Sequence, residues 1–167
     1  SMRNFLCVRG FASLKELGEY SHADDDIQRF VDAQNGGVYD RALAEIRSGR
    51  KRGHWIWYVF PQVRGLGMSW NANYYGIGSW KELHAYVAHT LLMARLVEIS
   101  QALLDLEGND PVAVLGGIDA VKVRSSMTLF ELASDNPVFG QVLDKYYKGE
   151  RDSLTLKFVE QFSDLPK

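Results

Sequence analysis

The sequence predicts a mainly α-helical fold, a single compact domain of about seven or eight helices. Apolar residues recur every three or four positions through most of the chain, which is the spacing of one helix face. Aspartate, asparagine or serine stands before these segments and glycine stands after them, as at helix termini. The chain has 167 residues, 46% of them hydrophobic and 24% charged, which is the composition of one globular domain.

Two helices are expected early in the chain. The first follows three aspartates at residues 24–26, whose charge suits a helix N-terminus, and ends at residues 35–37. The second ends at Gly49. Their inward faces are predicted to carry Ile27, Phe30 and Val31 in the first helix, and Tyr39, Ala42, Leu43 and Ile46 in the second.

Residues 53–62 interrupt this pattern, because nearly all of them are apolar or aromatic and no helical stripe is present. Such a run fits either a buried strand or a buried helical turn. The glycine-rich residues 65–78 that follow are expected to form an ordered loop. The prediction therefore leaves room for one short strand or hairpin near residues 54–77.

The strongest helical pattern lies in the middle of the chain. One helix is expected to start at Ser79, where Glu82 forms a capping box, and to end at Gly108. Its apolar face advances by four, three, four and three positions through Leu92, Leu96, Ile99, Leu103 and Leu106. Four further helices are expected to start near Asp110–Pro111, Ile118, Asn136–Pro137 and Asp152.

The predicted helices belong to one domain at residues 23–163, between an N-terminal arm at 1–22 and a C-terminal tail at 164–167. Ser1 is interpreted as an addition before a native Met2. Cys7 is the one cysteine in the chain, so no internal disulfide forms and a reducing, cytoplasmic location is expected. No apolar run approaches the roughly 18 residues of a membrane helix, so no membrane partner is expected.

The charge pattern narrows the classes of partner. The formal net charge is −2, which gives no overall basic field of the kind that nucleic-acid-binding proteins use. One basic cluster leaves a nucleic-acid contact open as an alternative: Arg47, Arg50, Lys51 and Arg52. His22, His84 and His89 have no metal-ligand spacing, so no metal site is expected and no cofactor is assigned.

The aromatic segment is the first of three clusters that suit a ligand site. Trp55 and Trp57 could stack on a planar ring, with His54 and Gln62 as polar handles. The alternative is a core segment, in which the aromatic residues supply buried area and His54 lies at its edge.

The second cluster consists of Gly65, Gly67 and Ser69. Closely spaced glycines let backbone N–H groups approach an anion, although this spacing is neither that of a P-loop nor that of a dinucleotide fingerprint. The alternative is a tight turn without a ligand.

The third cluster places the hydroxyls of Ser125, Ser126 and Thr128 inside a predicted helix, where such residues are poor choices unless they cap or bind something. Lys122 lies three positions from Asp119 and four from Ser126, so these side chains share a face. Lys122 could hold a phosphate or activate a serine. The alternative is an ordinary ion pair on a helix that packs closely through small residues.

Two strings in these clusters closely resemble the bacterial and plant family called domain of unknown function 1810 (DUF1810). One string is HWxWxxFPQ at residues 54–62, continued by GLGxS at 65–69 and by Tyr75; the other is Lys122 followed by SSMTLF at 125–130. The resemblance covers about residues 27–160 and implies a mostly α-helical fold with no established activity. At His89 the family usually has His-Pro, whereas this chain has His89-Thr90, so no role is assigned to His89.

We expect the clusters to meet in one pocket that binds a small molecule, such as a nucleotide or an ADP-ribose-like ligand. For a reaction there, His54 or Asp119 would be the general acid or base and Lys122 would stabilise charge; whether the protein is an enzyme is left open. The alternatives are a protein-interaction module that uses an exposed apolar patch and the nucleic-acid contact at residues 47–52. The expected ligand-binding residues are Trp55, Trp57, Gln62, Gly65, Gly67, Ser69, Tyr75, Ser125, Ser126 and Thr128.

Overall fold

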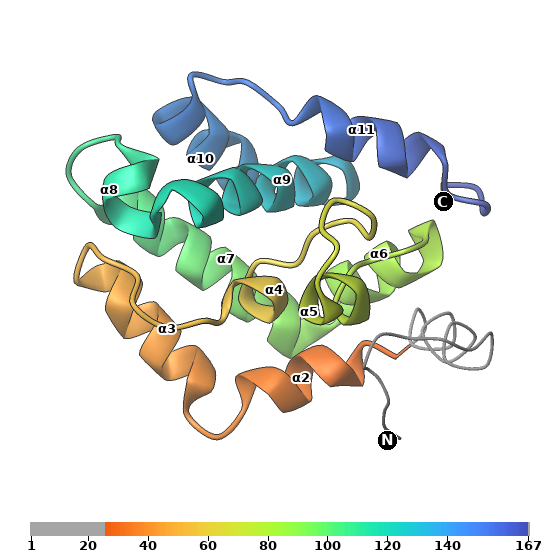
Figure 1. The fold of residues 1–167 in the computed structure, drawn as a ribbon, viewed down its shortest axis with the longest axis horizontal. Coiled ribbons are helices and arrows are strands. Elements are labelled where there is room, and N and C mark those ends of the chain that lie inside the picture. Colours follow the sequence, from red (N-terminus) through yellow and green to blue (C-terminus); the bar gives the residue numbers. More distant parts are fainter. Residues whose placement is uncertain (1–25, 167) are drawn as a thin grey trace.

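The computed structural model describes residues 26–166 and contains ten helices and no strand in that range (Figure 1). The predicted mainly α class is therefore confirmed, and the predicted arm at residues 1–22 lies outside the described residues. In chain order the helices are α2 (Gln28–Gln34), α3 (Val38–Arg47), α4 (Ile56–Val59), α5 (Trp70–Tyr74), α6 (Trp80–Ala88), α7 (Thr90–Asp105), α8 (Pro111–Leu115), α9 (Gly117–Ala133), α10 (Val138–Tyr147) and α11 (Ser153–Glu160).

Several predicted helix starts are confirmed by side-chain caps. Asp110 Oδ1 accepts hydrogen bonds from the backbone N–H groups of Val112 and Ala113 at the start of α8. Asp152 Oδ2 accepts the backbone N–H of Thr155 at 3.1 Å and caps α11 in the same way. These bonds satisfy N–H groups that have no partner inside their own helix.

The strand allowed near residues 54–77 is absent. The aromatic run instead forms the single helical turn α4, and Val63 and Ile77 form one isolated parallel bridge. In this bridge the Arg64 N–H donates to the Ile77 carbonyl at 2.8 Å, and the Ile77 N–H donates to the Gln62 carbonyl at 2.9 Å. Pairing does not extend further, because Tyr75 has helical backbone angles at the end of α5 and Gly65 has a φ of +109°, so neither residue continues a strand.

The single helix predicted from Ser79 to Gly108 is wrong, because the chain turns by 82° between α6 and α7. His89 adopts an extended backbone there, and its Nδ1 accepts the Leu92 N–H at 3.2 Å as an N-cap. Thr90 then occupies the first helical position, where proline is favoured in other chains. No single described helix is long and apolar enough to cross a membrane; α6 and α7 reach that length and composition only when taken together.

The helices α7 and α9, with 16 and 17 residues, form the centre of the described fold. α10 packs against both of them, α3 and α6 pack against α7, and α8 and α11 pack against α9. In Figure 1, α2 and α3 lie on one side of α7 and α9, and α11 lies on the other side. The short helices α4 and α5 lie between α2 and α9.

A row of buried aromatic rings joins four helices. Phe30 of α2 meets Tyr86 of α6 edge to face at 5.1 Å between ring centroids. Tyr86 contacts Phe130 of α9 at 5.1 Å, and Phe130 contacts Phe139 of α10 at 5.9 Å. All four rings are fully buried, so this row fixes how α2 and α6 sit on the central helices.

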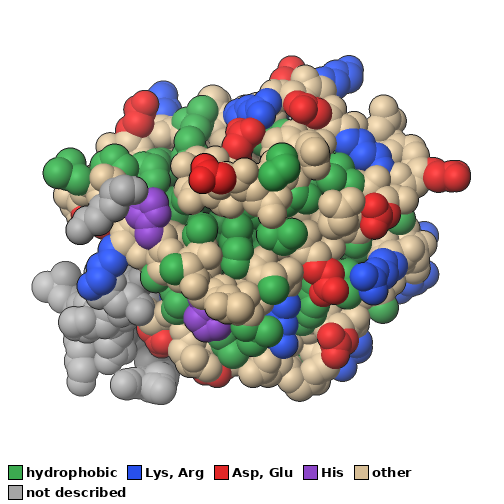
Figure 2. All heavy atoms as spheres, turned by 180° about the vertical axis from the view of Figure 1, so that it is seen from behind, with side chains coloured by type: hydrophobic (Ala, Val, Ile, Leu, Met, Phe, Trp, Pro, Cys, Tyr) green, Lys and Arg blue, Asp and Glu red, His purple; other side chains and the backbone are tan. Residues whose placement is uncertain are grey.

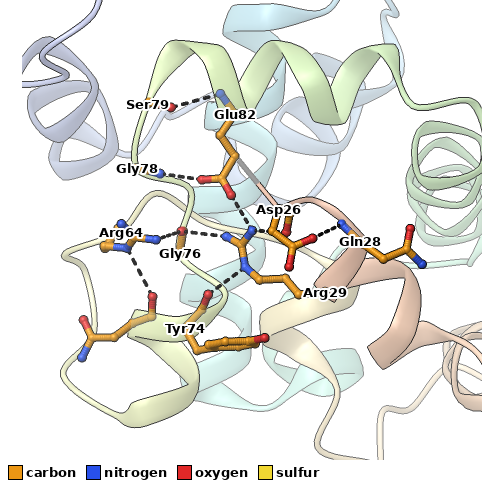
Figure 3. A network of polar contacts seen from close by, with 10 residues as sticks. Asp26, Gln28, Arg29, Arg64, Tyr74, Gly76, Gly78, Ser79 and Glu82 are labelled. Atoms are coloured by element: carbon orange, nitrogen blue, oxygen red, sulfur yellow. Dashed lines mark hydrogen bonds and ion pairs between the residues drawn. The ribbon is translucent and has the colours of Figure 1, made fainter. Parts of the chain in front are cut away.

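A buried ion pair between Arg29 and Glu82 holds the glycine-rich loop in place (Figure 3). Arg29 Nη1 lies 2.6 Å from Glu82 Oε2, and their side chains are 1% and 0% exposed. The same guanidinium donates to the carbonyls of Asp26, Tyr74 and Gly76.

The network continues on both sides of this pair. The Gly78 N–H donates to Glu82 Oε1 at 3.0 Å, while Arg64 donates to the carbonyls of Asn73 and Gly76. Two arginines and one glutamate therefore bind backbone groups of residues 73–78, at the C-terminal end of the loop between residues 64 and 78. A buried charge is tolerated when it is paired and hydrogen-bonded in this way.

We expect Glu82→Gln to lower the free energy of unfolding by about 3–5 kcal/mol, because the Arg29 charge would stay buried without its counter-ion. Urea unfolding followed by circular dichroism measures this change.

Glu131→Gln is the matched control. It breaks an ion pair with Arg151 whose side chains are 34–36% exposed, and it should cost at most about 1 kcal/mol. Equal losses in the two variants would show that burial does not set the importance of the Arg29–Glu82 pair.

Candidate functional site

An open cleft of about 520 Å³ lies between two segments that are far apart in the sequence. One wall is formed by residues 57–76, and the other by residues 118–125 of α9 with residues 152–154 at the start of α11. The lining consists of Trp57, Gln62, Val63, Leu66, Gly67, Met68, Ser69, Asn71, Ala72, Tyr75, Gly76, Ile118, Val121, Lys122, Ser125, Asp152 and Leu154.

The glycines of the first wall are required for close packing. A Cβ at Gly67 would lie 2.8 Å from the Ala72 Cβ, and a Cβ at Gly76 would lie 2.7 Å from the Arg64 Cα. Ser69 caps α5, because its Oγ accepts the Ala72 N–H at 3.1 Å. The segment predicted as an ordered loop is thus tightly folded, and it contains the short helix α5, which the sequence did not predict.

Aromatic side chains form the base of this wall. Trp57 is partly buried, and its Nε1 is a buried donor with no hydrogen-bond partner among the described residues. Tyr75 contacts both Tyr58 and Tyr74. Burial, followed by the neighbouring Tyr74 and Tyr58, raises the pKa of Tyr75 to about 12, so its hydroxyl is neutral at physiological pH.

Lys122 links the two walls. Its Nζ lies 4.9 Å from the centroid of the Trp57 ring, which is within range of a cation–π interaction. Its nearest carboxylate contact is Asp119 Oδ1 at 3.8 Å. Asp119 Oδ2 lies closer to another cation, Lys51 Nζ, at 2.7 Å. Lys122 is therefore a loosely paired cation on the wall of the cleft.

The hydroxyl groups of α9 attach the start of α11. Ser125 Oγ donates to Asp152 Oδ2 at 3.0 Å, and Thr128 Oγ1 accepts the Asp152 N–H at 3.0 Å. Asp152 Oδ2 also accepts the hydroxyl of Thr155 at 2.5 Å. These contacts explain why Ser125 and Thr128 occur inside this helix, whereas the buried Ser126 Oγ has no hydrogen-bond partner among the described residues.

Comparison with known proteins shows which family the chain belongs to. A family model for a protein of unknown function (DUF1810) matches residues 24–159. The chain belongs to the DUF1810 family. It is also similar to the crystal structure, at 1.38 Å, of the conserved hypothetical protein Rv1873 from Mycobacterium tuberculosis. The identity is 45% and the TM-score 0.78, over 81% of this chain and 97% of that chain. No curated protein matches.

The two DUF1810 strings do meet in space. Both contribute to the same cleft, although Gln62 and Lys122 are separated by about sixty positions. The predicted residues that line it are Trp57, Gln62, Gly67, Ser69, Tyr75, Lys122 and Ser125.

Six predicted site residues of this DUF1810 protein lie outside the lining: His54, Trp55, Gly65, Asp119, Ser126 and Thr128. His54 is exposed, Ser126 is fully buried and Thr128 is turned toward the backbone of α9 and α11. Gly65 has a φ of +109° and packs against the ring of Phe158, so its role is conformational.

Trp55 is in the core because of Glu45. The ring is 3% exposed, and its Nε1 donates to Glu45 Oε1 at 3.0 Å. The same oxygen accepts the N–H groups of Arg52 and Gly53. Burial raises the pKa of Glu45, but these hydrogen bonds outweigh that effect and hold the pKa below its ordinary value.

Sequence reasoning missed the apolar rim of the cleft. Met68, Ile118, Val121 and Leu154 are 92%, 76%, 62% and 54% exposed. Single apolar residues in turns and at helix starts carry no pattern that separates them from ordinary surface residues. Asp152 was predicted as a helix cap only, and its place in the lining depends on how α11 packs on α9.

Gly76→Ala should lower the free energy of unfolding by about 1–3 kcal/mol, because the added methyl meets backbone atoms of Arg64 and Ala72. Gly117→Ala is the control, since a Cβ there meets nothing within 4 Å, and it should be neutral or stabilising by up to about 1 kcal/mol. Thermal unfolding measures both; equal effects would contradict the tight packing of the loop.

Proposed function

We propose that this DUF1810 protein binds a small organic anion with a planar or apolar body in the cleft. The observation that carries the proposal is that two strings distant in the sequence line one cavity. Its volume of about 520 Å³ lies in the range of about 300–1,000 Å³ found for small-molecule sites.

The chemistry of the lining supports this class of ligand. Lys122 supplies a loosely paired positive charge, and Gln62 supplies both a donor and an acceptor. Trp57, Tyr75 and the apolar rim supply surface for a ring. A nucleotide or an ADP-ribose-like molecule, as expected from the sequence, is one candidate within this class.

A reaction in the cleft would depend on Lys122. Of the three residues considered as catalytic from the sequence, it alone belongs to the lining, whereas His54 and Asp119 do not. Charge stabilisation by Lys122 is therefore the role that the geometry supports.

The apolar rim favours protein contact as a second candidate, because Met68 and Ile118 are both more than three-quarters exposed. The nucleic-acid alternative has weaker support than either of these two candidates. The Lys51 side chain is only 6% exposed and pairs with Asp119, which removes one charge from the basic cluster. On the face shown in Figure 2, acidic and basic side chains are interspersed.

A ligand of the cleft should raise the melting temperature of the purified protein. At 100 times its dissociation constant it stabilises the fold by about 2.7 kcal/mol, a shift of about 5–10 °C for a domain of this size. A thermal-shift screen against nucleotides, NAD, ADP-ribose and common metabolites measures this.

The shift should disappear in Lys122→Ala and persist in Lys157→Ala, which removes an exposed lysine of α11 outside the lining. Circular dichroism checks that both variants keep their helices. A shift that survives Lys122→Ala would place binding elsewhere and contradict the proposal.

A further inference from the structure

We infer that the ligand carries a single negative charge on an aromatic or apolar body, as an aromatic monocarboxylate does, and not the several charges of a polyphosphate. This inference rests on the proposed function, because it concerns the same cleft. It follows from the charges, the glycines and the apolar rim of the lining.

The cleft offers one positive charge and one negative charge. Among the described residues that line it, Lys122 is the cation and Asp152 is the anion. The remaining polar side chains of the lining, Gln62, Ser69, Asn71, Tyr75 and Ser125, carry no charge at neutral pH.

Lys122 is available to one anionic group. Its side chain is 28% exposed, and its contact with Asp119 at 3.8 Å is long for an ion pair. Asp119 is already paired with Lys51 at 2.7 Å, so a ligand carboxylate could approach Lys122 without leaving Asp119 unpaired.

Asp152 disfavours a second anionic group. Its Oδ2 is engaged by Ser125 and by both the N–H and the hydroxyl of Thr155. The carboxylate is therefore fixed as the cap of α11 and cannot turn away from the cleft without losing these bonds. A second negative charge on the ligand would meet this fixed like charge.

The glycines of the loop do not require a phosphate to explain them. Gly67 and Gly76 lie against Ala72 and Arg64 at distances that exclude a side chain, and Gly65 lies against Phe158. The hydroxyl of Ser69 is engaged in capping α5. Packing accounts for this segment, so it adds no evidence for a phosphate-binding loop.

The rim favours an apolar body. Met68, Ile118, Val121 and Leu154 are all more than half exposed around the mouth of the cleft. An apolar ligand body that covers these side chains gains binding free energy from the water released. A sugar or a phosphate chain would not gain free energy in this way.

A matched series of ligands tests the charge rule. 2-Naphthamide, 2-naphthoate and 2-naphthyl phosphate share one ring system and carry charges of zero, −1 and about −2 at neutral pH. Isothermal titration calorimetry should give the tightest binding for 2-naphthoate. Lys122→Gln should weaken 2-naphthoate by roughly 10- to 100-fold, toward the affinity of the amide, while Lys157→Gln leaves it unchanged.

A second variant tests the charge count itself. Val121→Lys adds a cation on an exposed part of the same wall, so it should improve binding of 2-naphthyl phosphate more than that of 2-naphthoate. No such gain would contradict the view that positive charge limits the choice of ligand.

The possible results distinguish a failure of this inference from a failure of the proposed function. Tighter binding of 2-naphthyl phosphate or of AMP than of 2-naphthoate would overturn the single-charge inference and leave a small-molecule cleft in place. Equal binding of the amide and the carboxylate would also overturn it. Failure of all four probes to bind, together with no hit in the thermal-shift screen, would remove both the proposed function and the inference.

Discussion

The buried ion pair between Arg29 and Glu82 is the constraint on which the rest of the site depends. It joins α2 to α6, two helices far apart in the sequence, and the loop of residues 64–78 is tied to it through backbone carbonyls and one N–H group. Charges in such a place are stable only when nearly all of their hydrogen-bonding groups are satisfied. The loop supplies those groups, so its position and that of the first wall of the cleft are set together.

The second wall is held by a different kind of contact. Small hydroxyl side chains on α9 bind the cap of α11, and that cap brings Asp152 and Leu154 to the edge of the cleft. Residues next to one another in the string 125–130 therefore have separate roles: Ser125 lies in the lining, while Ser126 is in the core. A motif in sequence can thus combine residues that build a site with residues that only support it.

The cleft combines a nearly neutral lining with an apolar mouth. Its one cation is held over an aromatic ring, where a ligand anion and a ligand ring could be bound side by side. Asp119, one helix turn before Lys122, is neutralised by Lys51 from the segment between α3 and α4, so this pair adds no net charge beside the cleft. This arrangement suits an amphipathic ligand of low charge better than a highly charged one.

The sequence by itself determined the helical class, most helix boundaries and the family. Apolar spacing and caps such as Asp110 and Asp152 act locally, so they can be recognised without the fold. The same local rules failed at His89, because histidine is an unusual cap and the apolar pattern runs on across the 82° turn. They also left residues 53–62 undecided between strand and helix.

Only the tertiary structure decided which candidate residues share a site. Trp55 and Trp57 are two positions apart and look alike in sequence, yet Glu45 draws one into the core while the other faces Lys122. Lys51, which belongs to a basic cluster in sequence, is turned inward by Asp119. The reason is that long-range partners, which a local pattern does not contain, decide the direction of a side chain and the charge that remains free around it.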